Sequence, residues 1–130
     1  MKLPLAFAID LIVVLVFAIA GRSSHAESIE VIGVGLTAWP FLVGAVAGTV
    51  IALLWHRIRP TAQAATPAGL AAGTVVWLCT VVGGIALRLA SGDTAETPFV
   101  VVATISLGVL LLGWRVGYKL ICRARHATTG

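Results

Sequence analysis

The chain has 130 residues, of which 59% are hydrophobic and 11% are charged, and its mean hydropathy is +1.05. Soluble domains carry about 25% charged residues, so the composition excludes an ordinary soluble domain and indicates that lipid covers the apolar surface. The net charge of +4 does not favour nucleic-acid binding, because the basic residues lie at the ends of apolar runs and form no continuous face. Anionic lipid headgroups are the simpler partner for them.

The first apolar run predicts a membrane helix over about residues 3–21, close to the roughly 20 residues that a spanning helix needs. Together with Lys2, this run also resembles a signal peptide followed by small residues. Two features favour its retention as a helix. Asp10 interrupts a segment that should be uncharged in a signal peptide, and the later apolar runs keep the chain in the membrane in any case.

Three further runs predict membrane helices over about residues 31–55, 69–89 and 98–120, and a basic tail follows over 121–130. Pro40 is expected to bend the second helix, because proline removes one backbone hydrogen bond and clashes with the preceding turn. Alternatively, this helix begins at Trp39 and residues 31–38 lie at the membrane interface. Residues 1–130 are thus predicted to form a single membrane domain, an all-α bundle of four transmembrane helices.

Lysine and arginine are shared unequally between the two ends of these helices. One end carries Lys2, Arg57, Arg59, Lys119, Arg123 and Arg125, with Arg115 close to it. The other end carries Arg22 and Arg88 among several acidic residues. Because cytoplasmic segments are enriched in lysine and arginine, the sequence predicts a multi-pass protein of the cytoplasmic (inner) membrane with both termini in the cytoplasm.

Asp10 lies roughly 10 Å from the start of the first helix, at about 1.5 Å per residue, where an ionised carboxylate is costly. Arg115 lies at a similar depth in the fourth helix and is the best candidate partner. This intramembrane polar pair has two interpretations, a titratable or substrate-binding carboxylate and a fixed clamp between the first and fourth helices. The clamp is favoured, because a carboxylate beside a guanidinium is held ionised rather than poised to exchange a proton.

Arg22, His25 and Arg88 form a candidate polar cluster at the outer face, which could bind an anion. The same connections carry the carboxylates of Glu27, Glu30, Asp93 and Glu96. Loop ion pairs, and long side chains that reach the interface, are therefore the favoured explanation of these cations. No metal-ligand, nucleophile-and-base or phosphate-loop motif is present, so the sequence predicts no catalytic residue, metal site or cofactor.

Glycines spaced four residues apart are the clearest packing signal. They are Gly44 and Gly48 in the second helix, Gly69 and Gly73 in the third, and Gly113 and Gly117 in the fourth. Small residues on one face let helix backbones approach closely, so a tightly packed bundle is expected. Packing within one chain is favoured, and an oligomer interface stays open as the alternative.

A set of short segments, taken together, points to a family. The set comprises Asp10, Phe17, Gly21-Arg22, His25, Thr37–Leu42, Val76-Trp77, Arg88, Pro98–Thr104 and Leu112–Arg115. In this combination the chain resembles the family of small prokaryotic membrane proteins catalogued as domain of unknown function 3054. The resemblance extends from about Asp10 to Arg115. It implies an integral membrane protein with four spans and the same polar residues, and it implies no activity.

The sequence favours a non-enzymatic membrane protein, either structural or an accessory subunit that binds a membrane protein partner or further copies of itself. The alternative is a small oligomeric transporter that uses Asp10 for coupling or substrate binding, because the small multidrug resistance transporters also carry an acidic residue in their first helix. Their sequence motifs are not evident here, however, and their acidic residue is typically glutamate. The charge bias also excludes a dimer of oppositely inserted copies.

Overall fold

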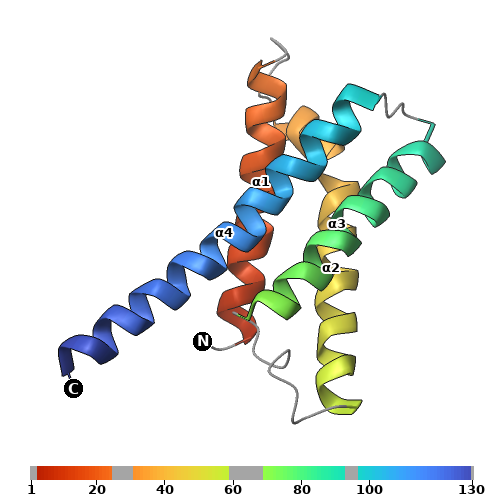
Figure 1. The fold of residues 1–130 in the computed structure, drawn as a ribbon. Coiled ribbons are helices and arrows are strands. Elements are labelled where there is room, and N and C mark those ends of the chain that lie inside the picture. Colours follow the sequence, from red (N-terminus) through yellow and green to blue (C-terminus); the bar gives the residue numbers. More distant parts are fainter. Residues whose placement is uncertain (1–2, 25–30, 59–68, 93–96, 130) are drawn as a thin grey trace.

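Four α-helices make up the fold (Figure 1). The computed structural model describes residues 3–24, 31–58, 69–92 and 97–129. The helices are α1 (Leu3–Ser24), α2 (Val31–Ile58), α3 (Leu70–Ala90) and α4 (Thr97–Thr129). Each is long and apolar enough to cross a membrane. The predicted all-helical fold with four candidate spans is therefore confirmed.

The helices alternate in direction, so that the beginning of α1 and the end of α4 lie at the same end of the bundle (Figure 1). α2 packs against α1 and α3, and α4 packs against the same two helices. α4 crosses α1 obliquely, and its last turns extend away from the other three helices (Figure 1). Asp10 in α1 and Arg115 in α4 consequently belong to neighbouring helices.

Three of the helices, α1, α2 and α4, extend beyond the ranges expected from hydropathy, whereas α3 is shifted by one residue. α2 begins at Val31, so residues 31–38 are helical, and Pro40 lies inside the helix. Proline has no N–H, so the Leu36 carbonyl lacks its usual helical donor there. The largest difference is at the other end of the chain, where α4 continues to Thr129 through the predicted basic tail. No proline and no glycine interrupt the chain between Tyr118 and Thr129, so hydropathy marks the edge of the apolar segment but not the end of the helix.

Phe41 joins all four helices in one half of the bundle. Its ring centroid lies 5.4 Å from that of Phe17 in α1, in an edge-to-face arrangement, and 6.2 Å from that of Phe99 in α4. A Cβ atom added at Gly84 in α3 would collide with the Phe41 ring. The absence of a side chain at Gly84 therefore makes room for the fully buried ring of Phe41.

α2 and α3 approach so closely that their backbones are nearly in contact. A Cβ atom built on Gly44 would lie 2.7 Å from the Cys79 carbonyl oxygen, and one built on Gly48 would lie 2.8 Å from Val76 Cα. Lipid chains are as apolar as the helix surfaces, so association in a membrane depends on such close packing rather than on a hydrophobic driving force. This glycine pair therefore packs within the chain, against α3.

Replacing Gly44 with alanine is expected to lower the stability of the bundle by about 1–3 kcal/mol, the usual cost of overpacking a tight core. The added Cβ would also lie 2.9 Å from Thr80 Cα, which belongs to backbone and cannot rotate away. Gly113→Ala is the matched control, because among the described residues no atom outside the adjoining part of α4 lies within 4 Å of the Cβ position at Gly113. Thermal unfolding of the detergent-solubilised proteins measures both. Equal midpoints for Gly44→Ala and the parent protein would contradict the packing argument.

Candidate functional site

Asp10 lies on the buried face of α1. Ala6, Asp10 and Val14 follow one another at four-residue spacing, and Phe17 continues the same face; all four side chains are buried. Asp10 itself is 1% exposed. The sequence therefore places a carboxylate where the pattern of α1 otherwise directs apolar side chains into the bundle.

Arg115 lies on the equivalent face of α4. Ala103, Leu107, Leu111 and Arg115 recur every four residues and are all buried. Arg115 is 2% exposed, which is unusual for a side chain that is always charged and is almost never fully buried without a partner. Each of the two helices thus contributes one charged residue to an otherwise apolar stripe.

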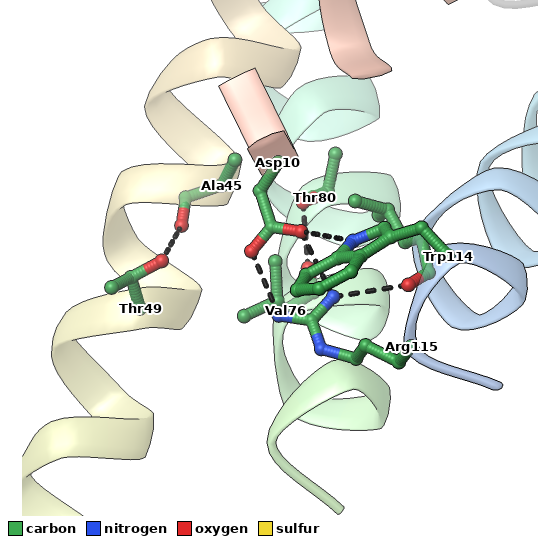
Figure 2. A network of polar contacts seen from close by, with 8 residues as sticks. Asp10, Ala45, Thr49, Val76, Thr80, Trp114 and Arg115 are labelled. Atoms are coloured by element: carbon green, nitrogen blue, oxygen red, sulfur yellow. Dashed lines mark hydrogen bonds and ion pairs between the residues drawn. The ribbon is translucent and has the colours of Figure 1, made fainter. Parts of the chain in front are cut away.

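The structure brings these two side chains into direct contact (Figure 2). Arg115 Nη1 donates to Asp10 Oδ1 at 2.9 Å, and Nη2 donates to Oδ2 at 2.8 Å. This is the two-pronged geometry in which a planar guanidinium matches a carboxylate, and such charge-assisted bonds are stronger than neutral ones. The predicted intramembrane polar pair is therefore a bidentate salt bridge between α1 and α4.

Two further groups of α4 complete the network. The Trp114 indole Nε1 donates to Asp10 Oδ1 at 2.9 Å, so both carboxylate oxygens accept hydrogen bonds and Oδ1 accepts two. Arg115 Nη1 also donates to the Leu111 carbonyl oxygen at 3.0 Å. The Arg115 guanidinium carbon lies 4.5 Å from the centroid of the Trp114 ring, a distance at which the ring face attracts a cation.

Gly73 in α3 makes room for the aliphatic part of Arg115. A Cβ atom built on Gly73 would lie 2.5 Å from Arg115 Cδ and 2.9 Å from Nε. The arginine stem therefore lies directly on the α3 backbone while its head reaches α1. Nearby, the buried Thr80 hydroxyl donates to the Val76 carbonyl of its own helix at 2.6 Å, as Figure 2 also shows. α3 thus positions the arginine by shape.

Two of the three side chains in the predicted outer-face cluster of Arg22, His25 and Arg88 lie outside the described part of the structure. Arg22 lies in the last turns of α1, but its side chain is outside the described part. His25 also lies outside the described residues. The Arg88 guanidinium carbon lies 4.5 Å from the centroid of the Phe99 ring, so this arginine packs on α4 at that end of the bundle.

The remaining predicted packing glycines differ from one another in their surroundings. Gly69 precedes α3 as its N-cap, in an extended conformation, and its carbonyl accepts the Gly73 N–H at 3.0 Å. Nothing is recorded within 4 Å of the Cβ positions of Gly113 and Gly117. The structure therefore uses Gly44, Gly48 and Gly73 for close contacts, and it directs the α4 pair away from the bundle.

Two tryptophans have roles that the sequence reasoning did not find. The Trp114 indole in α4 donates to Asp10 Oδ1. The Trp77 indole in α3 donates to the Thr104 carbonyl of α4 at 2.9 Å, and its ring lies against Gly108. A partly buried indole N–H needs an acceptor, and the position of Trp114 beside Arg115 is the signal that could have associated it with Asp10.

The network joins α1 and α4, and each oxygen of its carboxylate accepts at least one hydrogen bond. Three donors from Arg115 and Trp114 occupy the two oxygens of Asp10. Within the described part of the chain, no three His, Cys, Asp or Glu side chains come together as a possible metal site. Asp10 and Arg115 therefore form a buried ion pair between α1 and α4, and its hydrogen-bond donors belong to the same chain.

The fold and this buried ion pair define a small, all-helical protein with four candidate membrane spans. Comparison with models of protein families identifies the family to which it belongs. The model of the family described as "Protein of unknown function (DUF3054)" matches residues 7–118, and the chain belongs to that family, as the resemblance suggested. No curated protein and no solved structure matches the chain.

Replacing Asp10 with leucine is expected to cost about 3–5 kcal/mol of stability, because it leaves the Arg115 charge buried without its counterion. The double variant Asp10→Leu/Arg115→Met removes both charges and should recover most of that loss. Thermal unfolding of the two single variants and the double variant, arranged as a double-mutant cycle, measures the coupling. Additive losses in the double variant would contradict a direct interaction.

Trp114→Phe provides the milder comparison. It keeps the ion pair and an aromatic ring for the guanidinium but removes one donor to Asp10, so its cost should be smaller, roughly 1.5–3 kcal/mol for a bond to a charged group.

Proposed function

We propose that this protein is a non-enzymatic integral membrane protein, a structural or accessory subunit whose α-helical bundle binds a membrane protein partner or further copies of itself. The observation that supports the proposal most directly is the closed state of the Asp10 network. Arg115 and Trp114 of the same chain occupy the carboxylate. A group engaged in this way stabilises the arrangement of helices and is not presented to a substrate.

We also propose that the protein resides in the cytoplasmic (inner) membrane with both termini in the cytoplasm. The cations at the end of the bundle where α1 begins and α4 ends include Arg57, Lys119, Arg123 and Arg125. Their enrichment over the opposite end supports this orientation by the positive-inside rule. In this orientation Asp10 and Arg115 lie in the cytoplasmic half of the membrane.

The alternative, a small oligomeric transporter, requires the same site to change during transport. Asp10 would have to release Arg115 during each cycle to bind a proton or a cationic substrate. Separating a buried ion pair leaves both charges uncompensated in an apolar interior, so a transport cycle would need another group to replace Arg115 at each release. The two proposals therefore differ in whether this ion pair is permanent.

The orientation predicts the location of reporters fused to the chain. A reporter enzyme that is active only in the cytoplasm should be active when fused after Gly130, and one placed in the 93–96 connection should be inactive. A periplasmic reporter at the same two positions is the matched control and should give the reverse pattern. Periplasmic activity after Gly130 would overturn the proposed orientation.

Proton flux in vesicles distinguishes the clamp from the transporter. If the pair is a permanent clamp, vesicles containing the parent protein should show no substrate-dependent proton flux with a pH-sensitive dye. Asp10→Asn should then lower the yield of folded protein, and adding Arg115→Gln should restore it. A substrate-dependent flux that Asp10→Asn abolishes, while the variant remains folded and monodisperse, would establish the transporter instead.

A further inference from the structure

The C-terminal part of α4, Lys119–Ala127, is called the basic segment here and extends beyond the bundle (Figure 1). α4 has 33 residues and is therefore about 50 Å long, whereas the hydrocarbon core of a bilayer is about 30 Å thick. About 20 residues cross that core, and counting them from the start of α4 reaches the neighbourhood of Tyr118. A span that begins at the first turn of α4 would therefore leave the basic segment at the level of the lipid headgroups.

The basic segment carries positive charge without acidic residues on the same helix. Lys119, Arg123 and Arg125 are exposed, and the α4 sequence contains no aspartate or glutamate. Asp10 is engaged by Arg115. The other acidic residues of the chain belong to the two connections at the opposite ends of the helices. The segment is therefore a cationic stretch of helix, and its charged side chains are exposed.

The segment is also amphipathic. At about 100° per residue, Leu120, Ile121 and Ala124 share one apolar face, with Arg123 at one edge and Arg125 at the other. Leu120 is 58% exposed and Ile121 is 57% exposed, so the bundle does not cover this face. An apolar face bordered by cations is typical of a helix that lies at a membrane interface.

We propose that the basic segment binds the phosphate groups of anionic phospholipids. In this arrangement Leu120 and Ile121 face the acyl chains, and the cations at the edges of the apolar face reach the headgroup phosphates. A second copy of the basic segment is a poorer binding partner than anionic lipid, because pairing two copies would bring like charges together. The proposal rests on insertion of the bundle in a membrane, and it depends neither on the accessory role nor on which side the segment occupies.

The test uses the full chain with one fluorescent reporter. An environment-sensitive dye is attached at Ala124→Cys after replacement of the native thiols by Cys79→Ala and Cys122→Ser, and the protein is reconstituted in lipid nanodiscs. Discs of phosphatidylcholine alone are compared with discs that contain increasing fractions of phosphatidylglycerol. A blue shift of the emission that grows with the anionic lipid and weakens in high salt is expected, because salt screens exposed charges.

Charge variants test whether the cations cause the shift. Each lysine or arginine near an anionic surface contributes about fivefold to binding, so Lys119→Gln/Arg123→Gln/Arg125→Gln should weaken the response about 10²-fold and abolish the shift. The charge-preserving control Lys119→Arg/Arg123→Lys/Arg125→Lys should retain it. If the glutamine variant does not fold, the salt dependence of the emission shift in the parent protein shows whether the cations cause the shift.

Several results would overturn the proposal. Equal emission in the two kinds of disc would show that the segment does not respond to anionic lipid, and a shift that the glutamine variant retains would show that the cations do not cause it. A shift reproduced by inorganic phosphate in phosphatidylcholine discs would show that lipid is not required. A shift that depends on the number of protein copies per disc would indicate contact between copies instead. Nanodiscs expose both membrane faces, so this experiment is independent of the reporter fusions, and a wrong orientation would leave its outcome unchanged.

Discussion

The bundle depends on the requirement that a charge buried among apolar side chains be matched by an opposite charge. Asp10 and Arg115 are almost completely inaccessible, so each must find its partner inside the fold. The bidentate geometry restricts the relative height and rotation of α1 and α4, because moving either helix by one residue shifts its side chain by about 1.5 Å along the axis and about 100° around it. Desolvation offsets much of the Coulomb attraction in such pairs. The geometry of the pair therefore restricts how α1 and α4 can be arranged.

α3 provides the surface that receives both of the large side chains in the core. Gly73 and Gly84 lie about three turns apart and therefore on the same face of the helix. Gly73 accommodates the Arg115 stem, and Gly84 accommodates the Phe41 ring. The fully buried Thr80 lies between them on the same face and bonds within its own helix. One stripe of small residues thus positions a polar contact in one half of the bundle and an aromatic contact in the other, and the same stripe lets the neighbouring helices come close.

The features of this structure that can be predicted from the sequence are those determined by the distribution of apolar and charged residues along the chain. Apolar runs predict the four helices, and depth along the first and fourth predicts that Asp10 and Arg115 meet, since an isolated charge in an apolar span has few alternatives. Helix rotation is not fixed in this way, because it depends on tertiary contacts. Glycine spacing alone therefore could not distinguish Gly73, which touches Arg115, from Gly113, which has no recorded neighbour within 4 Å. The role of Trp114 was missed for the same reason, because its ring suits both a membrane boundary and a buried acceptor.

The continuity of α4 connects the buried clamp to the basic segment. Arg115 and Lys119 are about one turn apart on an uninterrupted helix. The salt bridge to Asp10 fixes the height and rotation of α4 at Arg115, and a rigid helix transmits that orientation to the turns that follow. The direction in which the segment leaves the bundle is thus set by an interaction inside it. The hydropathy boundary near Tyr118 conceals this relationship. It divides α4 into a membrane span and a tail, although the backbone forms one continuous helix.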